Sequence, residues 1–272
     1  GIACFNISPV TSIINPKEMN KKCFILSLLF CLSVVAVSAQ NRGLFDNDWR
    51  FALVPEEQEG KAKFGNPADV NYNDSQWRKL NVPHDWAVEG DFLASNPSGA
   101  GGGALPGGIG WYRKHFAVKA NRSGDNTDRY FIDFDGVFMN STVYLNGHEL
   151  GTRPYGYSSF RYDMTPYLNL SGENVLVVKV DNSDQPNSRW YSGCGIYRHV
   201  YLVQTNQLHV AHWGTFVNTV ALNNGKKAQM KIQVKVDGHA PDAADFQVVN
   251  TVYDANGKKV AQTKQKMSGR TR

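Results

Sequence analysis

The sequence predicts an all-β fold built from sandwiches, and three observations support this prediction. No long segment after Gln40 shows the periodicity of an amphipathic helix. Many short runs instead alternate apolar and polar residues with a period of two, and they are rich in β-branched and aromatic side chains. Glycine, asparagine, aspartate and proline separate these runs at short intervals, as expected for strands joined by turns.

The clearest strand lies at residues 129–135. Tyr130, Ile132 and Phe134 fall on one face of it, and Gly136 interrupts the run. A second strand is expected at 141–145. It is followed by Asn146-Gly147, which predicts a tight hairpin because both turn positions need a positive φ.

A short helical turn and two further strands are expected after this hairpin. In the segment 162–168, Asp163 is placed to cap a turn and Pro166 is compatible with its first residues. The runs 175–180 and 198–203 are dominated by valine and leucine. Each is about as long as a typical sandwich strand, so both are predicted to be buried strands.

The composition changes between residues 205 and 209, which indicates a domain boundary. We predict a first domain at 40–206 and a second at 207–272, where two segments alternate cleanly in the immunoglobulin manner. An immunoglobulin-like sandwich needs about 100 residues, and roughly 65 remain. The second domain is therefore expected to be incomplete.

The segment 19–39 has the features of a secretory signal peptide. It begins at Met19 with two lysines nearby, continues with an apolar run and ends in small residues before Gln40. The alternative is a membrane anchor, but an apolar run of about 14 residues is short of the ~20 needed to span a bilayer. We predict a periplasmic or secreted bacterial protein that leaves the membrane after cleavage, with residues 1–18 not part of the native protein.

Composition excludes several classes of function. The formal net charge is +5, but basic residues are scattered among acidic ones, so nucleic acid is not an expected partner. The seven histidines have no spacing typical of metal ligands, and nucleotide-binding and serine-hydrolase motifs are missing. Removal of the signal leaves Cys194 as the single cysteine, which we interpret as a buried apolar residue and not a nucleophile.

Two aromatic segments are candidates for sugar binding. His84, Asp85 and Trp86 are consecutive in the first segment, and Arg189 and Trp190 are adjacent in the second. Sugars bind by stacking a C–H face on an aromatic ring while planar polar groups pair with the hydroxyls. The alternative for each tryptophan is a core residue whose N–H finds a local partner. A glycine-rich stretch at residues 98–110 is either a flexible linker or a loop that closes over a ligand.

Six segments resemble the glycoside hydrolases of family 2, and within them the β-galactosidase group. They occur in the family's order and spacing at residues 77–86, 110–116, 134–148, 156–168, 173–182 and 188–198. The resemblance covers nearly all of the chain after the signal peptide. It is more specific for the family than for the sugar, since the choice of a galactoside depends on residues 83–86 only.

The resemblance implies a jelly-roll, galactose-binding-like β-sandwich, then an immunoglobulin-like sandwich, then a catalytic (β/α)₈ barrel with two glutamates. No pair of acidic residues here has the context of catalytic carboxylates, so the barrel is expected to be absent and the isolated chain inactive. The loops carrying Asp85 and Arg189-Trp190 would help to hold the terminal sugar. Some members use an acidic residue near this last motif for a cation. Ser188 and Arg189 stand there in this sequence, so we predict no metal or cofactor in this chain and leave a cation in the full-length enzyme open.

Three hypotheses follow for function. The first is an N-terminal fragment of a secreted β-galactosidase whose partner is a β-galactoside oligosaccharide or glycan, and whose full-length form is a candidate homo-oligomer. The second is a free-standing lectin-like module, and the third is a structural spacer. Within the first hypothesis, β-mannosidase and β-glucuronidase specificities stay open.

Overall fold

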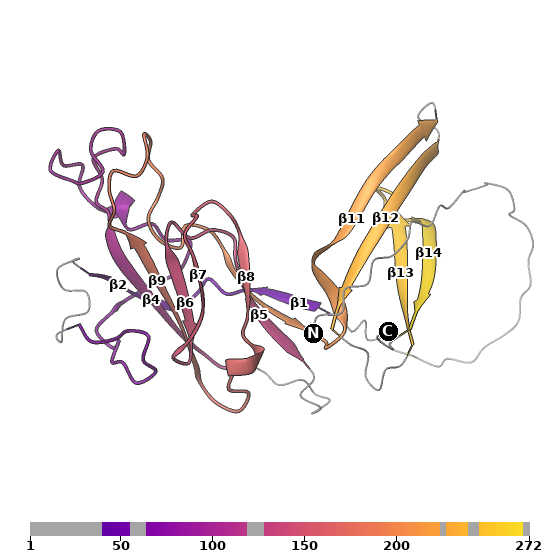
Figure 1. Cartoon of the computed structure of the whole chain (residues 1–272), viewed down its shortest axis with the longest axis horizontal. Helices are drawn as coiled ribbons and strands as arrows, with labels where there is room; N and C mark the ends of the chain where they lie inside the picture. Colours follow the sequence, from indigo (N-terminus) through magenta and orange to yellow (C-terminus); the bar gives the residue numbers. More distant parts are fainter. Residues whose placement is uncertain (1–39, 55–63, 119–127, 224–226, 239–244, 269–272) are drawn as a thin grey trace, which may run out of the picture. The chain divides into compact units, whose positions relative to one another are not determined.

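The computed structural model describes residues 40–54, 64–118, 128–223, 227–238 and 245–268 (Figure 1). The predicted signal peptide at 19–39 and the segment 1–18 lie outside the described residues. The chain divides into two compact units, one formed by Gln40–Gln204 and the other containing the residues from Thr205 onward. In the part of the chain that is described, no helix has the length and apolar character needed to cross a membrane.

The first unit is a sandwich of two antiparallel sheets. One sheet has four strands in the order β1-β10-β5-β8, and the other has six in the order β3-β2-β4-β9-β6-β7. The strands are β1 (Gln40–Leu44), β2 (Trp49–Val54), β3 (Arg78–Leu80), β4 (Gly108–Phe116), β5 (Arg129–Phe134), β6 (Ser141–Leu145), β7 (His148–Arg153), β8 (Phe160–Asp163), β9 (Asn174–Asn182) and β10 (Val200–Thr205). Two single-turn 3₁₀ segments complete the unit, η2 (Ala87–Glu89) and η3 (Thr165–Tyr167).

The main core lies between the two sheets. Ile132 and Phe134 of β5 and Leu176 and Val178 of β9 are fully buried in one continuous apolar cluster, together with Tyr112 of β4. The alternation in the sequence places these residues on inward faces, as it must in an antiparallel sheet with period-two side chains. The predicted all-β sandwich is confirmed.

The six-stranded sheet is also covered on its outer face. Val175 and Val177 of β9 point away from the main core and pack with Ile109 and Trp111 in a second apolar cluster. The segment 64–77 covers this cluster. Arg113 and Asp74 fix the segment to the sheet: the fully buried guanidinium donates from Nε to Asp74 Oδ2 over 2.8 Å. Because both faces of β9 are buried, its sequence is a nearly continuous run of apolar residues.

Two local predictions are confirmed, the hairpin at residues 146–147 and the short helical turn after residue 163. Asn146 and Gly147 have φ values of 50° and 83°, and they join β6 to β7 in a tight hairpin. The helical turn η3 contains Pro166 near its start. The N-cap residue is Met164, which makes no side-chain cap hydrogen bond, so the prediction of Asp163 as the cap is wrong by one position. Asp163 Oδ1 nevertheless accepts the backbone N–H of Thr165 over 3.0 Å.

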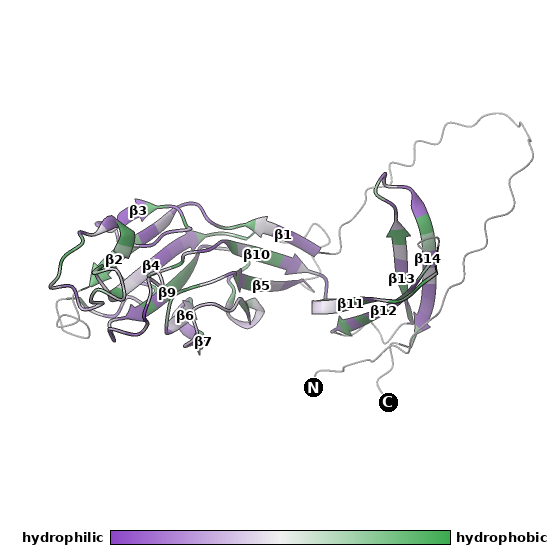
Figure 2. Cartoon of the chain, turned by 90° about the horizontal axis from the view of Figure 1, so that it is seen from above, coloured by the Kyte–Doolittle hydropathy of each residue, from purple (hydrophilic) through white to green (hydrophobic). Residues whose placement is uncertain are grey.

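The second unit consists of two hairpins. Strands β11 (His209–Asn223) and β12 (Lys227–Asp237) form one two-stranded sheet, and β13 (Phe246–Tyr253) and β14 (Lys259–Met267) form another. Along β14 half-buried and exposed positions alternate, and apolar and polar residues alternate along this strand in Figure 2. The predicted immunoglobulin-like arrangement of this unit stays a prediction.

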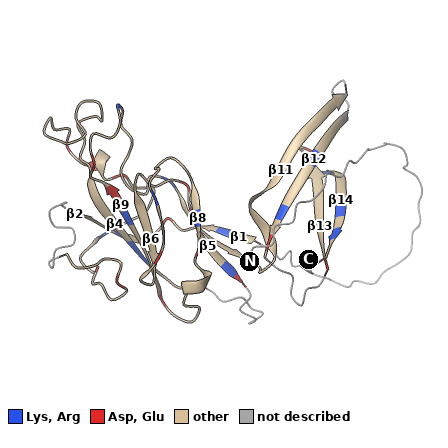
Figure 3. Cartoon of the chain, viewed as in Figure 1, with Lys and Arg blue, Asp and Glu red and all other residues tan. Residues whose placement is uncertain are grey.

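Charged residues of both signs are dispersed over the described residues of both units, without a continuous stripe of one sign (Figure 3). Several of them pair on the sandwich. Asp133 accepts two hydrogen bonds from Arg161, at 2.6 and 2.8 Å, and lies within 3.5 Å of Arg42.

Candidate functional site

The two aromatic segments singled out in the sequence lie side by side. The backbone N–H of His84 donates to the carbonyl of Ile196 over 2.8 Å, and that of Trp86 donates to the carbonyl of Cys194 over 3.2 Å. On its other side, Gly195 exchanges two backbone hydrogen bonds with Phe138, at 2.8 and 2.9 Å. Residues far apart in the sequence are therefore held in one small hydrogen-bonded platform.

Gly195 makes this close approach possible. Its φ is +113°, and a Cβ atom added there would lie 2.2 Å from the hydroxyl of Tyr112 and 2.8 Å from the carbonyl oxygen of His84. Contacts this short exclude any side chain unless the backbone shifts. A glycine is required at this position for both conformation and space.

The carboxylate of Asp85 connects the two segments. Its Oδ1 accepts the backbone N–H groups of Ala87 at 3.0 Å and Cys194 at 3.1 Å. Its Oδ2 accepts the hydroxyl of Tyr191. Burial and this hydrogen bond to Asp85 raise the pKa of Tyr191 above its ordinary value, so the phenol remains a donor. Three internal donors hold Asp85 in one orientation.

His84 lies beneath this platform. Its Nδ1 is 2.8 Å from the hydroxyl of Tyr112, and its ring packs edge-on against Phe51 with centroids 4.6 Å apart. Burial lowers the pKa of His84 below its usual value, although Glu89 acts in the opposite direction. The Nε2 atom is buried without a hydrogen bond, 3.4 Å from Glu89 Oε2. His84 is therefore a buried side chain whose lowered pKa favours the neutral imidazole.

Glu89 is fixed from the other side by Arg78. The guanidinium donates two hydrogen bonds to the carboxylate, at 2.6 and 2.8 Å, in a bidentate pair. Hydrogen bonding to Arg78 is the largest cause that lowers the pKa of Glu89, to about 2. The Glu89 carboxylate is thus ionised at neutral pH, and its hydrogen bonds are made with Arg78 and not with His84.

Trp86 is also part of the core. It is 4% exposed, its Nε1 donates to the carbonyl of Gly107 over 3.0 Å, and its ring stacks on Phe51 at 5.8 Å between centroids. Gly110 lies directly against it, since a Cβ at that position would be 2.6 Å from the indole. Trp86 is therefore a core residue whose N–H has a local partner, which is the alternative that the sequence left open. Trp190, in contrast, is exposed to solvent.

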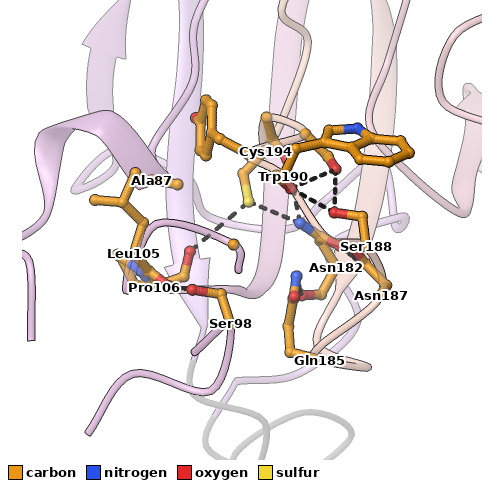
Figure 4. A pocket seen from close by; sticks show the side chains of 14 residues that line it. Ala87, Ser98, Leu105, Pro106, Asn182, Gln185, Asn187, Ser188, Trp190 and Cys194 are labelled. Carbon is orange, nitrogen blue, oxygen red and sulfur yellow. Dashed lines mark hydrogen bonds between the residues drawn. The ribbon is translucent and has the colours of Figure 1, made fainter. Parts of the chain in front are cut away.

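An open pocket lies between the glycine-rich loop and the segment that carries Trp190 (Figure 4). Trp190 is 61% exposed and its indole lies along the pocket. The wall is formed mainly by small, hydroxyl and carboxamide side chains. It includes Ala87, Ser98, Gly102, Leu105, Pro106, Asn182, Gln185, Asn187, Ser188, Trp190, Tyr191, Ser192, Gly193 and Cys194.

Carboxamides dominate the polar side of the pocket. Asn187 Nδ2 donates to Asn182 Oδ1 over 2.6 Å, and Asn182 Nδ2 donates to the carbonyl of Gly193 over 3.2 Å. Gln185 Nε2 donates to the backbone carbonyl of Asn182 over 3.3 Å. Carboxamides offer donors and acceptors together, which suits vicinal hydroxyl groups. Sequence reasoning missed these three residues, and the signal that could have found them was the cluster of amides between β9 and Trp190.

The thiol of Cys194 lies at the inner end of the pocket. It accepts a hydrogen bond from Asn182 Nδ2 at 2.8 Å, and it lies 3.8 Å from the carbonyl oxygen of Pro106 (Figure 4). Burial raises the pKa of Cys194 to about 12, so the thiol stays protonated at neutral pH. This agrees with a structural cysteine and excludes an activated nucleophile.

The glycine-rich stretch forms a compact loop. The Ser98 hydroxyl donates to the carbonyl of Leu105 over 2.8 Å, and Ala104 N–H donates to the carbonyl of Gly99 over 2.7 Å. Gly102 is pressed against Ser98, where a Cβ would lie 2.7 Å from the Ser98 Cβ. Ser98, Gly102 and Leu105 of this loop line the pocket. Closure of the loop over a ligand stays a prediction.

Arg189 is exposed next to Trp190 and does not line the pocket. The structure thus gathers Asp85 with the 191–194 segment and places Trp190 at the pocket, while His84 and Trp86 lie below in the core. Contact of any of these five residues with sugar stays a prediction. Among the residues with described positions, no group of three or more histidine, cysteine, aspartate or glutamate side chains is arranged to hold a metal ion.

Comparison with known proteins identifies relatives of this architecture. The family model described as "Glycosyl hydrolase 2 galactose-binding domain-like" matches residues 110–233. Beta-galactosidase BoGH2A of Bacteroides ovatus is 48% identical over 86% of this chain and 26% of its own length. A putative beta-glucuronidase of Formosa agariphila is 38% identical over 89% of this chain and 22% of its own length.

Solved structures show the same relationship. A beta-glycosidase from Bacteroides vulgatus matches 84% of this chain and 28% of its own chain at 36% identity, with a TM-score of 0.75. A glycosyl hydrolase family 2 member from Bacteroides cellulosilyticus matches 84% and 29%, at 32% identity and a TM-score of 0.73. The chain spans about a quarter of the length of the relatives it matches. It belongs to glycoside hydrolase family 2 and corresponds to the galactose-binding-like N-terminal region of those enzymes.

Proposed function

We propose that this chain is the N-terminal, sugar-holding part of a secreted β-galactosidase that hydrolyses terminal β-galactosides. The observation that carries the proposal is the 48% identity to a named β-galactosidase across 86% of the chain. That identity spans both aromatic segments and the glycine-rich loop that form the pocket.

In this proposal the chain contributes binding and not bond cleavage. Glycosidases need one carboxyl group to transfer a proton and a second as nucleophile or base, both facing the same glycosidic bond. Asp85, a carboxylate that contacts residues of the pocket lining, already accepts three internal hydrogen bonds. A carboxylate held in this way orients a loop, and proton transfer is assigned to residues outside this chain.

The pocket supports a sugar-holding role through its chemistry. The exposed indole of Trp190 offers a surface for the C–H face of a pyranose. The side chains of Asn182, Asn187 and Ser188 provide donors and acceptors for hydroxyl groups within the same pocket. The lining combines polar and apolar surface in similar amounts, as the mixed surface of a neutral sugar requires.

The experiment begins with the DNA beyond the codon for Arg272. We expect an open frame that continues into a barrel domain with two glutamates. The full-length product, tested on chromogenic β-galactoside, β-glucuronide and β-mannoside, is expected to hydrolyse the galactoside fastest. The chain of 272 residues alone is expected to be inactive on all three. Heat-labile turnover by the chain alone, or no turnover by the full-length product, contradicts the proposal.

A β-glucuronidase is the second candidate, because the second relative carries that name at 38% identity. A glucuronide has a carboxylate at C6, which a binding site recognises with a cation, and it also differs from a galactoside in the configuration at C4. The same panel of substrates separates the two specificities.

Secretion and the immunoglobulin-like form of the second unit belong to the same proposal. Cleavage at the predicted site would give a mature protein that starts at Gln40, in the periplasm or outside the cell. N-terminal sequencing of the protein recovered from fractionated cells tests the cleavage site and the compartment. Uncleaved protein in the cytoplasm contradicts both.

A further inference from the structure

Two exposed tyrosines lie next to the pocket, on the loop between β7 and β8. Tyr155 is 63% exposed and Tyr157 is 44% exposed, and their rings meet edge to face with centroids 5.7 Å apart. We call Tyr155 and Tyr157 the tyrosine pair. Soluble domains rarely expose adjacent large rings without a use, because each ring keeps apolar surface in contact with water.

The tyrosine pair is continuous with the pocket through Trp190. The indole Nε1 donates to the hydroxyl of Tyr157 over 3.4 Å, and Trp190 itself lines the pocket. A ligand that leaves the pocket along the indole therefore meets the ring of Tyr157 first and that of Tyr155 next.

The loop that carries the pair is held in place by the sandwich. Gly156 is packed so tightly on Phe138 that a Cβ there would lie 2.2 Å from its ring. The carbonyl of Gly156 accepts the Tyr197 hydroxyl over 3.0 Å, and the ring of Tyr157 packs edge-on against Phe138 at 5.3 Å. Rings fixed before binding lose little conformational entropy when a ligand stacks on them.

We infer that the tyrosine pair and Trp190 form an extended binding surface for the sugar units that follow the terminal residue of a neutral oligosaccharide. The inference rests on the proposed function, since it takes the pocket to hold the terminal sugar. Consecutive sugars present C–H faces that stack on aromatic rings, and the hydroxyl of Tyr155 is free to pair with ring hydroxyls at the surface. The substrate class is therefore an oligosaccharide and not a simple galactoside.

The test measures binding by the chain itself and needs no hydrolysis. Galactose, a β-linked galactose disaccharide and the matching tetrasaccharide are titrated while indole fluorescence and NMR shifts are followed. We expect affinity to rise by about tenfold or more from monosaccharide to tetrasaccharide, equivalent to ~1.4 kcal/mol. Tyr155→Ala is expected to remove this gain and leave the affinity for galactose unchanged, whereas Tyr155→Phe retains most of it.

Tyr253→Ala is the matched control, because Tyr253 is 61% exposed, belongs to the second unit and is not among the residues that line the pocket. The control is expected to keep the full gain with length. Equal affinity for all three sugars, or a gain that Tyr155→Ala leaves intact, overturns the inference. Self-association that Tyr155→Ala weakens, without any dependence on glycan length, would instead identify a protein interface. If affinity does not depend on glycan length, the full-length enzyme can still hydrolyse a simple galactoside. The two experiments therefore test the extended surface and the proposed function separately.

Discussion

The carboxylate of Asp85 accepts a hydrogen bond of 3.1 Å from the backbone N–H of Cys194, which lies 109 residues further along the chain. The same carboxylate accepts the Tyr191 hydroxyl. This one side chain therefore ties the segment after β3 to the segment that carries Trp190. These two hydrogen bonds fix the backbone directly after Trp190, although that segment is not part of a regular strand.

Replacement of Asp85 by alanine is expected to destabilise the chain by ~1–3 kcal/mol, because it leaves the N–H of Cys194 and the hydroxyl of Tyr191 without their acceptor. Urea unfolding followed by tryptophan fluorescence measures the change. Asp91→Ala is the control, because Asp91 is exposed and has no side-chain hydrogen bond among the described contacts. Equal stability of the two variants would show that Asp85 does not connect the segments.

The buried imidazole of His84 predicts a dependence of stability on pH. Burial lowers its pKa in the folded state below the ordinary 6.5, so the unfolded chain binds a proton more readily than the folded chain. The contribution of His84 is complete above about pH 6.5 and is lost as the pH falls through that value. The free energy of unfolding should decrease from pH 7.5 to about pH 5 more steeply in the wild type than in His84→Gln. Parallel pH profiles for the two proteins would contradict this assignment.

Gly195→Ala is expected to prevent normal folding of the first unit. The added methyl group would lie 2.2 Å from the Tyr112 hydroxyl, at a φ of +113° that disfavours any Cβ. Gly99→Ala is the control, because Gly99 also has a positive φ but nothing lies within 4 Å of the added atom. The control should lose only ~1–2 kcal/mol from the left-handed conformation. Soluble yield and thermal melting compare them, and a cooperative melt near the wild-type temperature for Gly195→Ala would refute the close packing.

Local patterns in the sequence were sufficient to predict the all-β class of the first unit, whereas its galactose-binding-like form was predicted from the family resemblance. Period-two alternation identified the buried face of β5, and Asn146-Gly147 identified the hairpin, because both signals depend on residues within a few positions. The outer apolar layer under residues 64–77 was not predicted. Its burial depends on the Arg113–Asp74 pair, which joins residues 39 positions apart.

The site shows the same division between local and long-range information. The sequence identified both aromatic segments but could not separate Trp86 from Trp190, since both stand beside polar residues. What separates them is tertiary: Gly107 and Gly110 close over Trp86, while no strand covers Trp190. The carboxamides of Asn182 and Asn187 were missed because such residues are common in loops, and only their convergence on one pocket gives them a role.

Trp190→Ala separates binding from stability. The indole is 61% exposed, so its removal should change the free energy of unfolding by no more than about 0.5 kcal/mol. In the full-length enzyme the same change should lower kcat/KM for a β-galactosyl oligosaccharide by an amount equivalent to ~1–3 kcal/mol, mainly through KM, because a stacking surface for the substrate is lost.

Trp213→Ala is the matched control for this last prediction. Trp213 is 76% exposed and belongs to the second unit, so it shares the residue type and the exposure of Trp190 without lining the pocket. The control should keep both wild-type stability and wild-type kinetics. If Trp190→Ala lost stability and left kcat/KM unchanged, the indole would be a structural residue and the pocket beside it would not hold the sugar. If both variants lowered kcat/KM equally, the effect would not be specific to the pocket.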